Sequence, residues 1–561
     1  MRTKQEDLFR MNQLLKNISN VRNGETVLLE KDKIYDVYED DCIFLHGYYC
    51  SNTASKQENP DGFRKTALWI EDKQNITIDG NGATLLIHGI MTPIVLRNCK
   101  NVMIKNLKVD YFRPTMSQFT VLKNDHGNCV LSIHPESLFE IRDNVLIWCG
   151  EQKENGKYRW EHPYKDTNTL SMYYEPKTNR LQFLDREDGD IFPSVPEFST
   201  IEQTDTYTLN VTLKNENAFL PEGCIVQSRN VVRDQIGGFF EACKNLKFEN
   251  IRIMFFHGLG MLSQFCENIT FRNCDFTPKS GRTFASNADG FQFSGCKGKI
   301  LIENNRAYGN HDDFVNIHGT HLQIRKAYRK ENALLVRFAN ENSWGFQAFH
   351  CEDIIEFIRW DTLLPYFRTK VLHYERLNDT EIKLFLKKLP SDIQEQKDAI
   401  ANLTQTPSVI IRNNYFGYTA ARSILCTTPK KVIISNNVFE HSAGPALLVE
   451  DDCNFWFESG YTRHILFKNN KIMDCGFLEG KESHMDIAVT PQVMKQDMKQ
   501  YVHGSLKIVG NTFLSPDGKP HLMQFQFIRS VRLKKNRFDT PLLIQKECSN
   551  VTKIKSHGSS V

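Results

Sequence analysis

Three aspartates in the middle of the chain could carry out acid–base chemistry. Asp289 lies in the segment NADGF, and the adjacent Asp312 and Asp313 follow 23 and 24 residues later in GNHDDFVNIHG. Carboxyls gathered in one place cannot all titrate normally, because like charges raise the pKa of at least one of them. Such a site holds a protonated donor beside an ionised acceptor, which is the equipment for cleaving a glycosidic bond. The residues therefore predict a glycosidase site, provided that the fold brings them together.

Regular β-structure is expected around these aspartates, because a nine-residue pattern recurs along the chain. In each copy, for example NITFRNCDF, the second and fourth positions are apolar and an Asn occupies the sixth or seventh position. The alternation predicts half-buried strands. Asn tolerates the left-handed backbone of a tight bend, and its amide can bond to an equivalent Asn on the next coil. The ten copies are 75–83, 101–109, 245–253, 268–276, 299–307, 408–416, 431–439, 464–472, 505–513 and 530–538.

The spacing of the copies predicts the fold class. Adjacent copies often start 23 to 26 residues apart, which indicates an all-β chain wound into a right-handed parallel β-helix. A β-sandwich would need ten chance matches. The pattern disappears twice, and short alternating strands separated by turns there predict two inserted antiparallel modules, similar to small β-barrels, that flank a groove.

Five parts of the chain follow from this pattern. An N-terminal helix over residues 6–19 is expected to cap the first coil, because apolar residues recur there at helical spacing. Those apolar residues are Leu8, Met11, Leu14, Leu15 and Ile18. The expected parts are the cap and first coils (1–110), the first inserted module (111–235), the coils that carry the aspartates (236–319), the second inserted module (320–406) and the C-terminal coils (407–561).

Stacking of coils would place the aspartates near one another. Neighbouring coils lie about one strand spacing, ~4.8 Å, apart. A separation of 23 residues suits one turn, so Asp289 is expected on the coil next to Asp312 and Asp313 and on a similar side. A bend at Gly309 and Asn310 is expected to turn both of the paired aspartates toward solvent. Adjacent coils with a diagonal offset favour the ~6.5–9.5 Å separation of inverting glycosidases over the ~5–5.5 Å of retaining ones.

Other interpretations of the same aspartates stay open. Asp289 precedes a glycine, and Asp-Gly is also a common turn sequence. Asp312 and Asp313 could bind calcium or serve a purely structural role. The neighbouring His311 and His318 are poor ligands for so hard an ion, which disfavours calcium.

Further side chains could bind sugar hydroxyls or form an aromatic platform. His318 could equally be a structural residue of the ladder, and each of the others is more often structural than functional when taken alone. The candidates for hydroxyl binding are Asn287, Asn316, His318 and Arg282, with His257 from the preceding coil; Trp344, Tyr418 and Arg422 are candidates for a platform or clamp.

Composition excludes several other classes of protein. The net charge is +3 with Lys and Arg scattered among Asp and Glu, so no basic stripe indicates nucleic acid. No apolar run approaches the ~18 residues of a membrane span, and the first twenty residues do not have the pattern of a signal peptide. The 15 cysteines include no CxxC pair, which argues against zinc; Cys99, Cys243, Cys266 and Cys296 precede strands and are expected to be structural.

The segment 284–319, FASNADGFQFSGCKGKILIENNRAYGNHDDFVNIHG, carries a resemblance to a known family. Its order of Asn-x-Asp-Gly, Asp-Asp and His-Gly is shared in outline with the polygalacturonases. It resembles more closely glycoside hydrolase family 110, the α-1,3-galactosidases, and the resemblance covers most of the chain. The resemblance implies a β-helix with two inserted barrels, Asp289 as the catalytic acid, and Asp312 and Asp313 as the paired bases.

The resemblance also implies an activity. Family members remove terminal α-1,3-linked galactose with inversion and without a metal, from the fucosylated blood-group B epitope or from linear α-1,3-galactosides. No cofactor, a carbohydrate partner, a periplasmic or secreted enzyme and a homodimer are implied in the same way. An Arg-x-Lys pair for a uronate is not found on 408–440, which favours a neutral sugar. The alternatives are a polygalacturonase-like or other β-helix glycosidase, a pectin-type lyase, and a carbohydrate-binding β-helix without chemistry.

Overall fold

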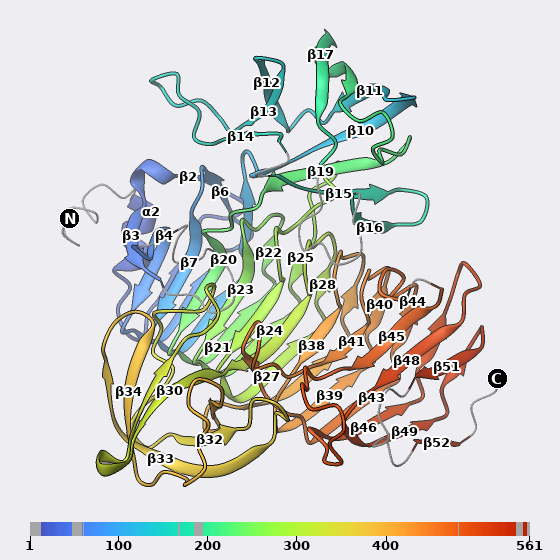
Figure 1. Ribbon diagram of the computed structural model, residues 1–561. Helices are drawn as coiled ribbons and strands as arrows, with labels where there is room; N and C mark the ends of the chain where they lie inside the picture. Colours follow the sequence, from blue (N-terminus) through green and yellow to red (C-terminus); the bar gives the residue numbers. More distant parts are fainter. Residues whose placement is uncertain are drawn as a thin grey trace.

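The chain folds into a long β-helix with two inserted modules. The computed structural model describes residues 13–47, 59, 61–165, 169–184, 195–480, 482–545 and 554–557. Within them, three sheets run side by side along the helix axis, and successive coils pair in parallel, as strands β21 (Lys244–Glu249) and β24 (Glu267–Arg272) do (Figure 1). The predicted parallel β-helix is confirmed.

Sheets A, B and C are the three faces of the β-helix. Sheet A contains, in spatial order, β1 (Thr26–Leu28), β5 (Gln74–Asp79), β8 (Lys100–Lys105), β21, β24, β27 (Lys297–Glu303), β36 (Pro407–Arg412), β39 (Lys431–Ser435), β43 (His464–Lys468), β46 (His503–Val509), β49 (Ile528–Lys534) and β52 (Ile554–His557). Sheet B contains β2 (Ile34–Tyr38), β6 (Thr84–His88), β9 (Lys108–Tyr111), β22 (Arg252–Ile253), β25 (Asp275–Phe276), β28 (Arg306–Ala307), β37 (Tyr415–Phe416), β40 (Val438–Glu440), β44 (Lys471–Met473), β47 (Thr512–Leu514) and β50 (Arg537–Phe538).

Sheet C carries the candidate site. It contains β3 (Ile43–His46), β4 (Phe63–Glu71), β7 (Thr92–Arg97), β20 (Ile236–Glu241), β23 (Leu259–Gln264), β26 (Phe291–Ser294), β29 (Val315–Thr320), β38 (Ile424–Cys426), β41 (Leu447–Val449), β45 (His484–Val489), β48 (His521–Phe525) and β51 (Leu542–Gln545). The short strand β42 (Glu458–Ser459) pairs antiparallel with the end of β29. Strand β3 is also antiparallel to its neighbour β4, close to the N-terminal end of the β-helix.

Each repeat copy spans a strand of sheet A, an Asn bend and a strand of sheet B. In the copy 268–276, β24 ends at Arg272, Asn273 takes a left-handed φ of 53°, and β25 begins at Asp275. The buried Asn that follows many of these bends forms a ladder through the interior. Asn414 Nδ2 donates to Asn437 Oδ1 at 2.9 Å, and Asn437 Nδ2 donates to Asn470 Oδ1 at 3.1 Å. The amide contacts predicted between coils are confirmed.

Apolar residues stack along the interior in the same way. Phe248 and Phe271 lie on successive coils with parallel rings and a centroid separation of 4.6 Å. The cysteines expected to be structural, Cys99, Cys243, Cys266 and Cys296, are all buried thiols. Helix α2 (Gln13–Ser19) buries Leu15 and Ile18 at the N-terminal end, while Leu8 and Met11 of the predicted cap lie outside the described residues. Among the described residues, no helix is long and apolar enough to cross a membrane.

The first inserted module follows β9 and contains two antiparallel sheets. Seven strands pair in the order β16 (Arg180–Phe183), β15 (Thr169–Glu175), β19 (Ile225–Asn230), β10 (Met116–Asp125), β11 (Asn128–Ile133), β18 (Thr208–Leu213) and β17 (Phe198–Asp205). The second sheet consists of β12 (Leu138–Arg142), β13 (Val145–Cys149) and β14 (Glu161–Pro163). This module has its own apolar core around Phe119, Trp148 and Leu209, and it lies across the upper side of the β-helix in Figure 1.

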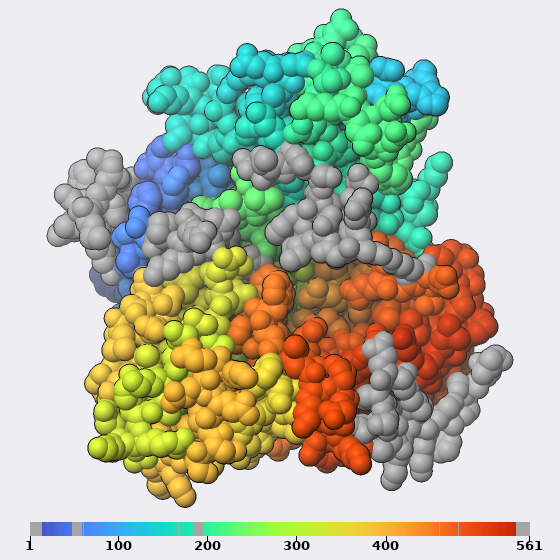
Figure 2. Space-filling view, in the orientation of Figure 1, coloured from blue at the N-terminus to red at the C-terminus, as the bar shows by residue number. Residues whose placement is uncertain are grey.

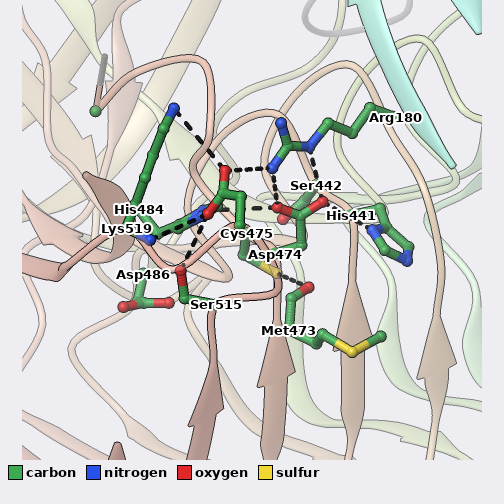
Figure 3. Close-up of polar contacts among 12 residues, drawn as sticks. Arg180, His441, Ser442, Met473, Asp474, Cys475, His484, Asp486, Ser515 and Lys519 are labelled. Atoms are coloured by element: carbon green, nitrogen blue, oxygen red, sulfur yellow. Dashed lines mark hydrogen bonds and ion pairs between the residues drawn. The ribbon is translucent and has the colours of Figure 1, made fainter. Parts of the chain in front are cut away.

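An arginine of the first module attaches it to the C-terminal coils. Arg180 Nε donates to Asp474 Oδ2 at 2.9 Å, and its Nη2 donates to Asp517 Oδ2 at 2.9 Å (Figure 3). Each carboxylate also binds a histidine: Asp474 Oδ2 lies 2.9 Å from His441 Nδ1, and Asp517 Oδ1 lies 2.8 Å from His484 Nε2. The two segments are 294 residues apart in sequence, so this network fixes the module over the β-helix.

The second inserted module follows β29 and is a closed barrel. Its strands pair in the order β30 (Leu322–Tyr328), β31 (Ala333–Arg337), β34 (Glu381–Leu386), β33 (Pro365–Arg376), β32 (Ile354–Ile358) and β35 (Ala399–Asn402), with one short 3-10 helix, η2 (Arg329–Glu331). Ile358 and Leu363 of this module share a buried cluster with Cys453, Val493 and Phe527 of the C-terminal coils. Figure 2 shows the yellow module directly beside the orange-red coils.

Removal of one amide of the interior Asn ladder should destabilise the β-helix. Asn437→Ala leaves the buried backbone N–H of Asn414 and the carbonyl of Ile411 without their partner. An unpaired buried group costs ~1–3 kcal/mol, so the free energy of unfolding should fall by about 3 kcal/mol in urea denaturation. Asn436→Gly is the matched control, because Asn436 is exposed and Gly accepts its φ of 57°. Equal stability of both variants would contradict the role of the ladder.

Candidate active site

Register between coils aligns the catalytic candidates in one column. A ladder of single β-bridges joins Ser286 to Asn310 and Asn310 to Thr419. Further along, Phe291 pairs with Val315, and Val315 pairs with Ile424. In the pairs Ser286–Asn310 and Phe291–Val315, the two residues are 24 positions apart in sequence. Asp289 therefore lies beside Asp313, with Arg422 beside Asp313 on the following coil, and Asp312 is one residue out of this column.

The glycine after Asp289 allows this close packing. The N–H of Gly290 donates to the carbonyl of Asp313 at 2.9 Å, which joins the two coils at the site. A Cβ at Gly290 would approach Asn310 Nδ2 to 2.8 Å, closer than real side chains come. The Asp-Gly sequence thus serves the close stacking of two coils, and it places the Asp289 carboxyl at the edge of β26.

The three aspartates converge. One carboxylate oxygen from each of Asp289, Asp312 and Asp313 lies within 4.8 Å of the others. Asp289 is 5% exposed and Asp313 is 0% exposed, whereas the side chain of Asp312 is 34% exposed. The expectation that the bend turns both paired aspartates toward solvent is therefore wrong for Asp313, which points inward to its ion pair, and right for Asp312.

Arg422 binds one member of the trio. Its Nη2 donates to Asp313 Oδ2 at 3.0 Å, and its backbone N–H donates to Oδ1 at 3.0 Å. Arg233 Nη1 lies 3.8 Å from Asp312 Oδ2. Within the described part of the chain, Asp289 forms no ion pair. The two arginines thus form ion pairs with Asp312 and Asp313, which lie on one coil, and among the described residues no cation contacts the carboxyl of Asp289.

This arrangement separates the proton affinities of the carboxyls. Burial, together with the charges of Asp312 and Asp313, raises the pKa of Asp289 well above its usual range. Burial also raises the pKa of Asp313, to about 8, while the Arg422 guanidinium acts in the opposite direction. Arg422 lowers the proton affinity of Asp313, and among the described residues no cation forms an ion pair with Asp289. Asp289 is therefore the member of this pair that holds a proton more strongly.

A pocket of ≈ 330 Å³ opens above the trio, and its wall has the chemistry of a sugar site. Gln292 and Asn316 line it, and their buried oxygens, Oε1 and Oδ1, have no hydrogen-bond partner in the protein. Buried amide oxygens are normally paired, so these two are available to hydroxyl donors of a ligand. Six acids also line the pocket, namely Asp289, Asp312, Glu450, Asp451, Asp452 and Glu458, with Arg422 as the lining cation.

The other predicted binding residues have different positions. Asn316 lines the pocket as expected. Asn287 is buried close by with its Oδ1 unpaired, but it does not line the pocket. His318 is also behind the wall, where its Nε2 lies 3.2 Å from Gln292 Nε2 and its Nδ1 lies 2.8 Å from the carbonyl oxygen of Gly319. His318 therefore orients a pocket amide and does not reach the ligand space itself.

Two predicted binding residues hold the first module in place. Arg282 forms ion pairs with Asp110 and Glu136, both at 2.6 Å, and is 6% exposed, so its guanidinium is fully used within the protein. His257 is buried between Thr115 and Asp234, with its Nε2 3.1 Å from Asp234 Oδ1. Neither lines the pocket, and the expectation that Arg282 and His257 bind sugar is wrong on geometric grounds.

The predicted aromatic platform is also elsewhere. Trp344 is 4% exposed in the core of the second module, and Tyr418 donates its hydroxyl to the carbonyl of Thr283 at 2.9 Å. The aromatic residues that do line the pocket are Phe455 and Trp456. The segment DDCNFWFES lies between two repeat copies and combines three aromatic residues with acids, which is a signal for a ligand-binding loop. The local sequence does not indicate which of these side chains are exposed.

Two groups of side chains among the described residues could hold a metal ion. One is the trio Asp289, Asp312 and Asp313, and the other is Asp474, His484 and Asp517. In the second group the Arg180 guanidinium already lies between the two carboxylates (Figure 3). In the trio, Arg422 provides the counter-charge at Asp313. Both groups therefore contain a built-in cation where a metal would otherwise compensate the acids.

Comparisons with known proteins agree on one family. A family model described as GLAA-B beta-barrel domain II matches residues 333–400, within the second module. Alpha-1,3-galactosidase A of Bacteroides fragilis (strain YCH46) is 34% identical over 501 residues, which cover 88% of this chain and 79% of that protein. Alpha-1,3-galactosidase A of Akkermansia muciniphila is 32% identical over 506 residues, which cover 88% of this chain and 79% of that protein.

Solved structures match over most of the chain at low similarity. A family 28 exopolygalacturonase of Yersinia enterocolitica has a TM-score of 0.31 and 11% identity, and the match covers 94% of this chain and 78% of that one. The A-module of a mannuronan C-5 epimerase from Azotobacter vinelandii has a TM-score of 0.35 and 9% identity, and the match covers 98% of this chain and 96% of that one.

The raised pKa of Asp289 should lower the free energy of unfolding of the protein as pH rises. An unfolded chain releases that proton near pH ~3.9, whereas the folded protein retains it to higher pH. The carboxyl therefore lowers the stability by about 1.4 kcal/mol for each pH unit between its unfolded and folded pKa values. Asp289→Asn removes this cost, so the variant should melt at a higher temperature than the wild type, with a gap that grows from pH 4 to pH 7.

The control is Asp125→Asn, because Asp125 is exposed on the first module. The melting temperature of this variant should equal that of the wild type at each pH. A constant difference between Asp289→Asn and the wild type across this pH range would contradict the retained proton.

Proposed function

The chain belongs to the α-1,3-galactosidase family of glycoside hydrolases, and from this premise we propose that it removes terminal α-1,3-linked galactose from oligosaccharides and glycoconjugates. The observation that carries the proposal is the trio Asp289, Asp312 and Asp313 at the base of a pocket with unpaired amide oxygens. Hydrolysis of a glycosidic bond needs one carboxyl with a proton and one without, and the trio offers both.

Asp289 is the proposed general acid. Its carboxyl lines the pocket, and burial beside two like charges keeps it protonated. As the bond between C1 of galactose and the glycosidic oxygen breaks, Asp289 transfers its proton to that oxygen, and the acceptor leaves as a neutral alcohol. A positioned acid of this kind contributes ~10²–10⁴-fold to the rate.

Asp312 is the proposed general base. It is the member of the trio with the most exposed side chain, and it lines the same pocket. A water that it deprotonates attacks C1, its oxygen forms the new bond, and the proton stays on Asp312 until solvent removes it. Arg422 holds Asp313 through two contacts and favours its ionised form, and the charge of Asp313 disfavours loss of the Asp289 proton.

Inversion at C1 is part of the proposal and rests on the family resemblance. Stacked coils with a diagonal offset predict the carboxyl separation of ~6.5–9.5 Å found in inverting enzymes, whereas the nearest oxygens of the trio lie within 4.8 Å of one another. The distance in this structure therefore does not favour inversion over retention. Identification of the anomer that is released first distinguishes the two stereochemical outcomes. The homodimer implied by the resemblance also stays a prediction, which light scattering would test.

The charge of the pocket favours a neutral sugar. Among the described residues, six acids line it, and the one cation in its wall, Arg422, is already bound to Asp313. A uronate or a sulfated sugar would lie among like charges, and no cation of the pocket would offset the free-energy cost of its desolvation. Galactose is uncharged, and its hydroxyls can donate hydrogen bonds to the unpaired oxygens of Gln292 and Asn316. The polygalacturonase alternative is disfavoured for this reason.

Two substrates distinguish the acid from the base. Hydrolysis of α-galactosyl fluoride needs no proton on the leaving group, whereas hydrolysis of α-1,3-galactobiose does. Asp289→Asn should lower kcat on the disaccharide by ~10²–10⁴-fold and affect the fluoride much less. Asp312→Asn should lower both by similar factors. Full activity of Asp289→Asn on the disaccharide would show that another group donates the proton.

The released sugar identifies the reaction and its stereochemistry. Incubation with the B-type trisaccharide and with linear α-1,3-galactobiose, followed by proton NMR, should show β-galactose as the first anomer. Initial α-galactose would establish retention, and no galactose from either substrate would contradict the proposed function. The rate should be unchanged after treatment with a chelator, because Arg422 and not a metal compensates the trio. Loss of activity that calcium restores would overturn this assignment.

A further inference from the structure

A loop at the mouth of the pocket carries exposed aromatic side chains. Residues 452–458, called here the aromatic loop, follow β41 and end in β42. Phe455 is 56% exposed and Trp456 is 37% exposed, and both line the pocket that contains Asp289 and Asp312. Their rings meet edge to face at a centroid separation of 5.2 Å. Single exposed aromatic residues are common, whereas two adjacent exposed rings at the mouth of a pocket form a continuous apolar surface of the kind that marks ligand sites.

The loop is built around one buried carboxylate. Asp452 accepts hydrogen bonds from the backbone N–H groups of Asn454 (2.6 Å), Phe455 (3.0 Å), Trp456 and Phe457 (2.9 Å). Four successive amides on one carboxylate fix the backbone of nearly the whole loop, because charge-assisted bonds of this kind are strong. The exposed position of the two rings is therefore set by the fold and is present before any ligand binds.

Two parts of the chain attach the loop to the β-helix and to the second module. At its end, β42 pairs with β29, where Glu458 faces Thr320. At its tip, Asn340 Nδ2 of the second module donates to the carbonyl oxygen of Phe455 at 3.1 Å. Asn340 lies between β31 and β32, and its Oδ1 accepts from the N–H of Asn342 at 2.7 Å, which fixes the amide orientation.

The depth of the pocket assigns the loop to one side of the scissile bond. Asp289, Gln292 and Asn316 are all at most 5% exposed, so the polar groups that bind the terminal sugar lie at the base. Phe455 and Trp456 are exposed, so they lie at the opening. An enzyme that removes a terminal residue holds that residue at the closed end, and the remainder of the substrate extends through the mouth.

Building on the proposed function, we propose that Phe455 and Trp456 form the binding platform for the leaving sugar, and that the second module sets this platform through Asn340. The occupant is a neutral pyranose ring, whose apolar C–H face packs on the indole and phenyl rings. Glu450, Asp451 and Glu458 around the platform disfavour an anionic sugar in this position. Asn340 is a positioning residue, since it contacts the loop backbone only.

The test compares substrates with and without a leaving sugar. Trp456→Ala should lower kcat/KM on α-1,3-galactobiose by ~10–100-fold, as expected for loss of a stacking surface worth ~1–3 kcal/mol. Hydrolysis of α-galactosyl fluoride, which has no ring on that side, should change less than twofold. Trp456→Phe should recover part of the loss, because a smaller aromatic face remains. Phe219→Ala is the matched control, since Phe219 is a similarly exposed aromatic residue on the first module and should alter neither rate.

The outcomes separate this proposal from the proposed function. If the wild type hydrolyses neither substrate, the proposed function fails. If Trp456→Ala loses activity equally on both substrates while its melting temperature is unchanged, the platform belongs to the terminal galactose and the proposal is overturned. If neither rate changes, the rings do not contact substrate, which also overturns it.

The role of Asn340 has its own measurement. Asn340→Asp keeps the acceptor for the Asn342 N–H but places an oxygen against the carbonyl of Phe455. KM for α-1,3-galactobiose should rise ~3–10-fold with little change in kcat, and the rate on the fluoride should be that of the wild type. An equal loss on both substrates, or an unchanged KM, would contradict a positioning role for the second module.

Discussion

Fixed register between stacked coils is the constraint on which the site depends. Parallel pairing holds Ser286, Asn310 and Thr419 in one ladder, and three residues later the same offset places Asp289, Asp313 and Arg422 in one column. Because the column is made of backbone pairing, the carboxyls cannot separate to relieve their repulsion. Their proton affinities have to diverge instead, and the cation on the neighbouring coil decides which carboxyl keeps its charge.

The surrounding coils offset the cost of holding these acids together. Burial of charged and like-charged groups is unfavourable, and a site of this kind persists only where other interactions over-determine it. Here the interior ladder from Asn305 to Asn536 satisfies buried amides on coil after coil, and stacked rings such as Phe416 and Phe439 continue the core beside it. The same regular repeat that stabilises the β-helix therefore permits an unfavourable cluster at one position along it.

Much of this could be predicted from the sequence, for a physical reason. The alternation of apolar residues and the Asn bends are local patterns, so the coils, and with them the proximity of Asp289 to Asp312 and Asp313, follow from one-dimensional periodicity. The roles of Arg282 and His257 could not be predicted, because their partners Asp110 and Asp234 lie at the borders of the first module, 172 and 23 residues away. Gln292 was missed because an alternate strand position of an ordinary repeat gives no local sign of an unpaired oxygen.

The aromatic loop and its contact with the second module distinguish one position on a repetitive scaffold. A β-helix presents nearly the same edge on each coil, so the column alone does not enclose a substrate. The first module is held over the coils by Arg180 and Arg282, and the second module contacts the aromatic loop through Asn340. The second module leaves the β-helix next to the aspartates, since β29 leads directly from Asp313 into its barrel. The first module returns to the β-helix at β20, two coils before the strand β26 that follows Asp289. The described residues that line the pocket all belong to the β-helix coils and the aromatic loop, so the second module acts on the pocket through that loop. A change at Asn340 should therefore alter substrate binding without moving the acids.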